Sequence, residues 1–180
     1  MEISERELAM LNFYRASELQ GGLALGRLVE HVRDPELITK LTEHSAEEVM
    51  HAQLWTETIL AVGGRPHPTS DTYQARYAAV IGTPTSLLEV LALTQVFERG
   101  VYRHFTRHLR QPGTHRRVQA TLRRMLDEER GHLSWVLEWL ERHPRRETIN
   151  VLMRRYREID ATIYAQLLVE YEWEALACAS

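Results

Sequence analysis

The chain has 180 residues, 44% of them hydrophobic and 26% charged, and a formal net charge of −3. This composition is ordinary for a single soluble globular domain and indicates neither a polyanion-binding protein nor an acidic tail. The one cysteine, Cys178, excludes an internal disulfide and a cysteine-based zinc site, which favours a reducing compartment. Because the charged N-terminal segment lacks a signal-peptide run and no apolar stretch approaches membrane length, no membrane span and a cytoplasmic location are expected.

Glycine and proline divide the chain into long segments with the 3.6-residue periodicity of helices. The first helix is expected at about 4–33. The second has Asp34 as its N-cap, Pro35 at its first helical position and Gly63 as its stop. Since almost no loop separates these two helices, they are expected to form an antiparallel hairpin.

The second half of the chain repeats this arrangement. Helices are expected at about 84–110 and 114–142, joined by a short Pro-Gly turn. Residues 63–83 connect the two hairpins, and because a structureless loop of that length is unusual, a short helix is expected near 71–80. Such a connection is long enough to cross from one end of a helical bundle to the other.

A fifth long helix follows at about 146–173, with one apolar stripe, and no segment has the pattern of a strand. The expected fold is therefore all-α. It is an antiparallel four-helix bundle over 4–142 with a C-terminal fifth helix, all within a single domain of residues 1–180.

The pattern Glu-x-x-His occurs twice, as Glu48 with His51 and as Glu129 with His132. A chain rich in glutamate and histidine produces such a pair by chance about once, so that the pattern alone is weak. In both helices, however, apolar residues one turn away on either side place the pair on the inward face. Both pairs are therefore expected in the core.

The other two bundle helices each place one lone acid on their apolar face, Glu18 in the first and Glu98 in the third. All four inward glutamates lie 14 to 16 residues from the turn of their hairpin, at Asp34 or Gly113. At a rise of about 1.5 Å per residue, they share a height of about 21 to 24 Å above those turns. The polar residues of four helices are thus expected to meet at one level.

Four carboxylates and two imidazoles in an apolar interior need compensation, because an uncompensated buried ion costs about several kcal/mol. Two divalent cations balance four carboxylates. Mixed imidazole and carboxylate ligands without a thiolate suit iron or manganese better than zinc. The alternative is two chance motifs together with four core polar groups that are hydrogen-bonded within the protein.

This set of residues resembles the di-iron carboxylate site of the ferritin-like superfamily, which includes rubrerythrin, bacterioferritin, the ribonucleotide reductase small subunit, multicomponent monooxygenases and aldehyde-deformylating oxygenases. The resemblance covers about residues 4–142. It implies two iron ions, or alternatively manganese or a mixed manganese and iron pair. It implies that Glu48 and Glu129 bridge the metals, that Glu18 and His51 complete one metal, and that Glu98 and His132 complete the other.

In related oxygenases, an acid directly before the bridging glutamate holds the histidine of the opposite half. By that resemblance, Glu47 orients His132 and Glu128 orients His51, in the way that metal-bound histidines commonly donate their second N–H to a carboxylate. The alternative is that both acids are simple surface residues.

Three aromatic residues lie one helical turn from these ligands and are candidates for catalytic or electron-relay roles: Tyr14, Tyr102 and Trp55. Aromatic residues at helical spacing are more often part of the core, and that alternative is favoured. Gly21 and Gly22 lie beside Glu18, where they either leave room for a ligand or allow close helix packing. The same two alternatives apply to Gly131.

Residues 99–124 contain eight arginines, three histidines and no acid. A resemblance to a ferritin-like tRNA hydroxylase family makes RNA binding a less favoured alternative. A solvated helix face is preferred, with His104 and His108 outside the inward stripe, so that nucleic acid is not expected as a partner.

The leading prediction is a non-haem di-iron oxidoreductase that uses O2 or peroxide and an external electron donor to oxidise a small or apolar substrate. The alternatives are an iron-handling ferroxidase or storage protein, a rubrerythrin-like peroxidase, and a purely structural bundle. The peroxidase alternative is weakened because the chain has no CxxC pair and has Gln95 and Val101 around Glu98, where that family has a further glutamate. A homodimer is compatible with each of these predictions.

Overall fold

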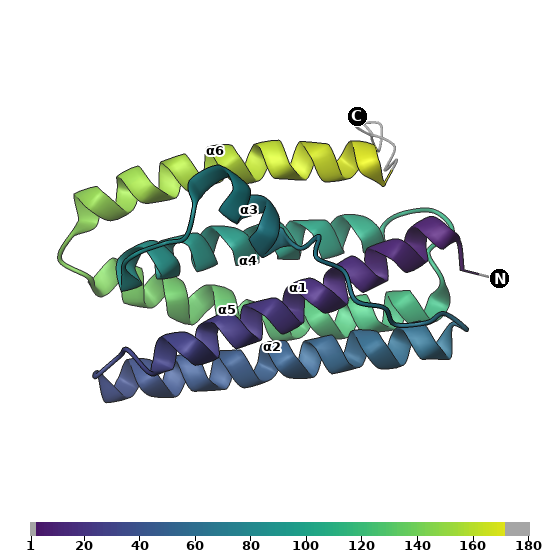
Figure 1. Ribbon diagram of the computed structural model, residues 1–180, viewed down its shortest axis with the longest axis horizontal. Coiled ribbons are helices and arrows are strands. Elements are labelled where there is room, and N and C mark those ends of the chain that lie inside the picture. Colours follow the sequence, from purple (N-terminus) through teal and green to yellow (C-terminus); the bar gives the residue numbers. More distant parts are fainter. Residues whose placement is uncertain (1–2, 172–180) are drawn as a thin grey trace.

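The computed structural model describes residues 3–171 of the chain (Figure 1). This part of the protein is all-helical, without a strand, as the sequence predicts. Its helices are α1 (Glu5–Val29), α2 (Pro35–Ala61), α3 (Tyr73–Ile81), α4 (Leu87–Leu109), α5 (Arg116–Arg142) and α6 (Arg146–Glu170). None of these described helices is long and apolar enough to cross a membrane. Cys178 and the predicted end of the last helix at 173 lie outside the described residues.

Local capping chemistry fixes where the helices begin. The Asp34 carboxylate accepts hydrogen bonds from the backbone N–H groups of Glu36 and Leu37, at 2.9 and 3.3 Å, and Pro35 occupies the first helical position. Ser86 and Glu89 form a capping box, so that α4 begins at Leu87 rather than at the predicted residue 84. Similarly, α1 ends at Val29, earlier than the predicted residue 33.

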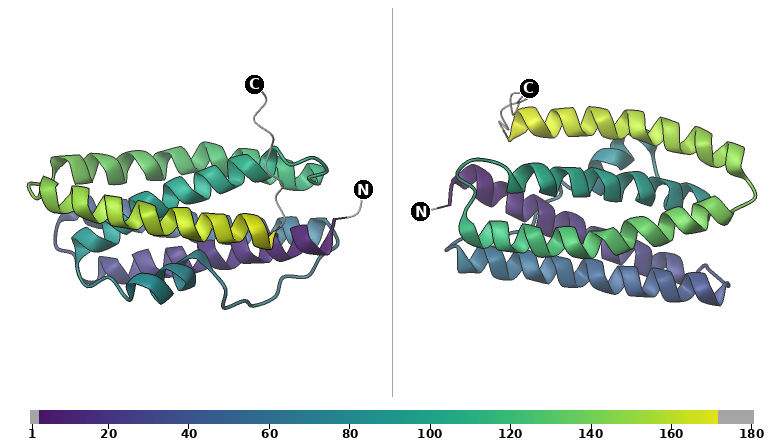
Figure 2. Two further views of the ribbon diagram at one scale, coloured as in Figure 1. Left: turned by 90° about the horizontal axis from the view of Figure 1, so that it is seen from above. Right: turned by 180° about the vertical axis from the view of Figure 1, so that it is seen from behind.

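The long helices pair as antiparallel neighbours (Figures 1 and 2). Helix α1 packs along α2, α4 along α5 and α2 against α5 in this way, whereas α6 packs against α4 and runs in the same direction as α4 (Figure 1). Gly22 allows α1 to approach α2 closely, because a Cβ at this position would lie 2.8 Å from the Val49 side chain and 2.9 Å from the Ser45 carbonyl oxygen. For Gly22, close helix packing is therefore the better explanation.

The segment between α2 and α4 returns along the molecule and contains α3, which contacts α1 and α6 (Figure 2). Asp160 of α6 holds this arrangement together. Its carboxylate accepts hydrogen bonds from the Tyr77 hydroxyl of α3 and the Arg103 guanidinium of α4, each at 2.8 Å. On α4, Gly100 leaves room for this carboxylate, since a Cβ there would lie 2.6 Å from Asp160 Oδ1.

The core consists of two apolar clusters, one toward each end of the long helices. The first includes Met10, Trp55, Phe105 and Met125, and the second includes Leu25, Leu41, Leu91, Val136 and Leu140. On each of α1, α2, α4 and α5, the predicted ligands fall in sequence between residues of the two clusters. A layer of buried polar side chains therefore divides the core.

The arginine-rich stretch divides into two kinds of residue. Most of its arginines are exposed, as the sequence predicts. The prediction that His104 and His108 avoid the interior is wrong, because both side chains are buried. Tyr73 hydrogen-bonds to Nδ1 of His104, and Tyr14 lies 3.3 Å from Nδ1 of His108. Tyrosines on other helices thus provide the partners that make these histidines tolerable in the core.

Candidate metal centre

Seven buried side chains from four helices gather in the polar layer and form two overlapping groups. Within each group, the potential ligand atoms all lie within 4.8 Å of one another. One group consists of Glu18, Glu48, His51 and Glu129, and the other of His44, Glu48, Glu98 and His132. Glu48 belongs to both groups, and each group has the spacing and ligand types to hold a metal ion.

The structure brings together all six residues that the sequence singles out as ligands. Glu18 comes from α1, Glu48 and His51 from α2, Glu98 from α4, and Glu129 and His132 from α5. Each is buried, with at most 4% of its surface exposed. Because helical residues three or four positions apart share a face, α2 and α5 can each direct a carboxylate and an imidazole to the same point.

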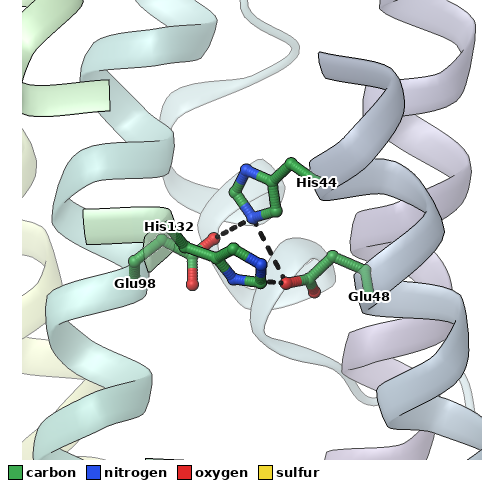
Figure 3. Close-up of side chains that lie close together, drawn as sticks. All are labelled: His44, Glu48, Glu98 and His132. Atoms are coloured by element: carbon green, nitrogen blue, oxygen red, sulfur yellow. Dashed lines mark ion pairs between the residues drawn. The ribbon is translucent and has the colours of Figure 1, made fainter. Parts of the chain in front are cut away.

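His44 is the residue that the sequence analysis missed. Its Nε2 atom lies 3.3 Å from Glu48 Oε1 and 3.3 Å from Glu98 Oε1, and its ring stacks on that of His132 with centroids 3.8 Å apart (Figure 3). His44 lies one turn before Glu48, on the face that also carries Leu41. The helical spacing from Glu48 could have indicated that His44 faces the core. A lone histidine on an apolar helix face is ordinary in a protein core, however, and does not by itself indicate a ligand.

Glu129 lies between the histidines of the two groups. Its Oε1 atom is 3.3 Å from His51 Nδ1, and its Oε2 atom is 3.0 Å from His132 Nδ1. Glu48 Oε1 lies 3.2 Å from His132 Nδ1. Glu18 Oε2 is more distant from His51 Nδ1, at 3.7 Å. The carboxylates of Glu48 and Glu129 are thus the central groups of the cluster.

Two further acids hold the outer nitrogens of these histidines. His132 Nε2 lies 2.8 Å from Glu47 Oε2, and His51 Nε2 lies 3.0 Å from Glu128 Oε2. These are the two contacts that the resemblance implies, and both are present. With Nε2–H donating outward, the Nδ1 atoms of both rings face the carboxylates at the centre.

Several atoms at the centre have no hydrogen-bond partner within the described residues, although they are buried: His44 Nε2, Glu48 Oε1, His51 Nδ1 and Glu129 Oε1. A buried polar atom without a partner costs about 1–3 kcal/mol. All four belong to the two groups of potential ligands and face one another across short distances. A single cation can accept electron pairs from several such atoms at the same time. This set of donor atoms therefore fits a metal ion.

The carboxylates raise the affinity of the three histidines for protons. Burial lowers the pKa of His44, but Glu48 and Glu98 outweigh it and raise the pKa to about 9. Burial likewise lowers the pKa of His51 and His132, and the neighbouring carboxylates raise these values to about 11 and about 12. Without a cation, protons on the imidazoles therefore supply positive charge to the cluster.

The four central glutamates respond in opposite directions. Burial raises the pKa of Glu48 and Glu129, but their histidine neighbours outweigh it and hold both values below the usual range. Burial and the charge of Glu48 raise the pKa of Glu18 well above its usual value and that of Glu98 to about 7. Without a metal ion, Glu18 and Glu98 therefore bind protons more readily than ordinary glutamates, and their titration is coupled to that of the other groups in the cluster.

The three aromatic candidates contact residues other than the potential metal ligands. The Tyr14 hydroxyl donates to Met10 Sδ at 3.0 Å and lies near His108. Trp55 is fully buried and packs on Tyr14, with ring centroids 5.2 Å apart. Tyr102 is half-buried and hydrogen-bonds to Arg130, which raises the pKa of that arginine. These contacts support a packing role for Tyr14 and Trp55, and Tyr102 also packs against the first apolar cluster.

No model of a known protein family, no curated protein and no solved structure matches this chain. What the centre does is therefore inferred from its donor atoms and from the space beside it. Four carboxylates, three imidazoles and no thiolate make a hard, oxygen-rich set with some nitrogen, which suits first-row divalent metals such as iron and manganese.

Proposed function

We propose that the protein is a non-haem di-iron oxidoreductase with a ferritin-like fold. In this assignment, α1, α2, α4 and α5 form the four-helix bundle, and α6 is an added fifth helix. Two features support it: the antiparallel hairpins joined by a long connection, and the presence of at least one potential ligand on each of the four helices. The observation that carries the proposal is the pair of overlapping, buried ligand groups that share Glu48.

The proposed centre holds two metal ions through seven side chains. Glu18, His51 and Glu129 with the shared Glu48 hold one ion. His44, Glu98 and His132 with the same Glu48 hold the other. Two divalent cations bring four positive charges against four carboxylates, so that the buried cluster becomes neutral when the three imidazoles are neutral. Iron is the proposed metal, and manganese or a mixed pair has the same ligand preferences.

The surrounding residues orient and isolate the centre. Glu47 and Glu128 accept the outer N–H groups of His132 and His51, which fixes the tautomer and direction of each ring. The apolar clusters on both sides exclude bulk water from the polar layer. When bound, an iron pair supplies the electrons and coordination sites that O2 or peroxide needs for activation.

A cavity beside the centre favours oxidation of an organic substrate over iron storage. It has a volume of about 490 Å³, is bordered by Glu48 and Glu98, and is otherwise lined mainly by apolar residues. This size is within the range of roughly 300–1,000 Å³ that is usual for small-molecule sites. Conversion of a C–H bond to C–OH by O2 takes up two electrons and two protons and releases one water, so an external electron donor completes the reaction.

Anaerobic Fe(II) titration followed by exposure to O2 tests the proposal. We expect two iron ions per chain and rapid O2 consumption by the loaded protein. The variant Glu48→Gln should lose both properties, whereas Glu43→Gln, which changes an exposed acid on the same helix, should keep them. One iron or none in the parent protein contradicts the dinuclear centre. A large shell in light scattering, with iron accumulating beyond two ions per chain, supports storage instead.

A further inference from the structure

The cavity beside the metal centre differs in character between its inner and outer ends. The buried residues Glu48 and Glu98 lie at its inner end. The walls are formed by apolar residues of α1, α3 and α4, among them Leu25, Tyr77 and Phe97. The outer end is lined by exposed residues of α1 and α3 and of the turns that follow them. A molecule entering the cavity therefore passes from a solvated rim to an apolar interior.

Gly21 keeps the inner end accessible. A Cβ at this position would lie 3.0 Å from Glu48 Oε2 and 3.2 Å from the Gln74 side-chain nitrogen. The absence of a side chain thus leaves a face of Glu48 bordering the cavity. Gly131, in the second Glu-x-x-His motif, has open space around it and does not line this cavity. Only Gly21 therefore matches the expectation that a glycine makes room for a ligand.

The rim carries two basic side chains and no acid. Arg27 lies in the last turn of α1 and His31 in the turn that follows the helix; both line the cavity and both are exposed. Neither forms an ion pair with a residue in the part of the chain that the structure describes. Glu48 and Glu98 are the only acids among the described lining residues, and both lie at the opposite, buried end. The rim thus offers an uncompensated positive charge to a ligand.

We propose that this cavity binds an amphipathic anion, which is a small molecule with an apolar body and one anionic head group. The head group lies at Arg27, with His31 beside it, and the apolar end points toward Glu48 and Glu98. Arginine suits this role because its planar guanidinium donates two parallel hydrogen bonds to a carboxylate or a phosphate. The oxidation of this ligand rests on the proposed function, whereas its binding does not.

This orientation has a chemical consequence. A head group anchored at the rim keeps its contact with water, whereas the same charge moved into the apolar interior would lose its solvation. The atoms nearest Glu48 and Glu98 then belong to the apolar end. In the proposed enzyme, oxidation takes place at the end of the molecule remote from its charge.

Calorimetric titration of the full chain with matched ten-carbon probes tests the inference. Zn(II)-loaded protein is used, so that no turnover occurs, and the metal content of every sample is measured. At low ionic strength, we expect decanoate to bind about fivefold more tightly than decan-1-ol. This factor corresponds to the contribution of about 1 kcal/mol that an exposed ion pair makes to binding. Decyl phosphate, in a parallel titration, distinguishes a phosphate from a carboxylate preference, and tighter binding of either anion than of the alcohol supports the proposal.

Two variants and one control locate the ligand. Arg27→Gln should remove the preference for the anion and leave decan-1-ol binding unchanged. Ala24→Phe, which adds bulk to an exposed lining position one turn from Gly21, should weaken all probes at least about fivefold. Arg33→Gln changes an exposed arginine that does not line the cavity and should have no effect.

Each outcome separates this inference from the proposed function. Equal binding of anion and alcohol, or an anion preference that survives Arg27→Gln, overturns the head-group site and places the anion elsewhere, for example at the metals. Loss of the preference in Arg27→Gln together with absence of bound metal supports the cavity site and contradicts the metal centre. Bound metal without any probe binding leaves the proposed centre standing and overturns the cavity site.

Discussion

The hairpin of α1 and α2 and the hairpin of α4 and α5 carry the same polar pattern, but they contribute unequally to the centre. The first supplies four of the seven potential ligands and the second supplies three. The difference lies one turn before the central glutamate, where α2 has His44 and α5 has the fully buried Met125. One ligand group therefore has two imidazoles and the other has one, which teaches that a repeated motif need not give two equivalent metal positions.

Removal of the shared carboxylate is expected to have the largest effect. In Glu48→Gln, both ligand groups lose the same central charge, so both metal positions should weaken by more than about 100-fold, beyond the cost usual for an outer-sphere contact. Metal analysis after dialysis against trace Fe(II) measures this. Glu43→Gln is the matched control on α2, and retention of metal at both positions in Glu48→Gln would show that Glu48 is not the shared ligand.

Replacement of His44 by the methionine of the opposite half makes the two hairpins alike. His44→Met should weaken the group that contains Glu98 and His132 by about 100-fold or more, and leave the other group nearly unchanged. Titration with Co(II), followed by visible absorption, should then show one tight site in place of two. His67→Gln, an exposed histidine of the connection, serves as control. Equal weakening of both sites contradicts the assignment of His44 to one group.

The outer acids give a smaller and crossed effect. Glu47→Gln, on α2, should weaken metal binding at the group with His132, and Glu128→Gln, on α5, should weaken it at the group with His51, each by about 10–100-fold. The same Co(II) titration separates the two sites. Glu57→Gln, another exposed acid of α2, should leave both affinities unaltered. Weakening of the group with His51 in Glu47→Gln, or of the group with His132 in Glu128→Gln, would refute the crossed arrangement.

Raising the pH should destabilise the metal-free protein by a few degrees. The pKa of His44 is raised to about 9 by its carboxylate neighbours, so its stabilising proton is fully present below about pH 6.5 and is lost as the pH rises through 9. His51 and His132 lose theirs at higher pH. The melting temperature of metal-free protein should fall by about 5 °C from pH 7 to pH 10.

Metal-loaded protein provides the control for this pH effect. Its cations keep the imidazoles deprotonated throughout, so its melting temperature should change less over the same range. The pKa of Glu98, raised to about 7, has the same sign of effect in the metal-free protein, but most of its contribution to stability is lost before and around pH 7. Greater stability of the metal-free protein at pH 10 than at pH 7 would contradict the proton-filled cluster.

Helical periodicity was sufficient to predict the six-residue set, because a charged residue at a core position of an amphipathic helix is visible in sequence. His44 obeys the same periodicity, yet imidazole is common in cores and only its contacts with Glu48 and Glu98 distinguish it. The burial of His104 depended on Tyr73, which lies on another helix and 31 residues away. Partners of that kind are set by tertiary packing, and no local pattern encodes them.

The cavity was also beyond prediction from sequence. A short helix near 71–80 was expected from loop length alone, but its position over α1 depends on long-range contacts. The expectation that Gly21 makes room for a ligand became specific only with the distances to Glu48 and Gln74. Helix ends shifted by a few residues for a local reason, as at Ser86, where a capping box sets the start of α4.

The Asp160 carboxylate joins three helices that carry little of the metal centre. It holds α3 through Tyr77 and α4 through Arg103, and α3 in turn forms one wall of the cavity. In the proposed enzyme, α3 is therefore a wall of the cavity that carries no potential ligand and is held by a contact outside the metal centre. Substitutions in α3 or α6 can alter which molecule enters while the four ligand-bearing helices keep the same chemistry.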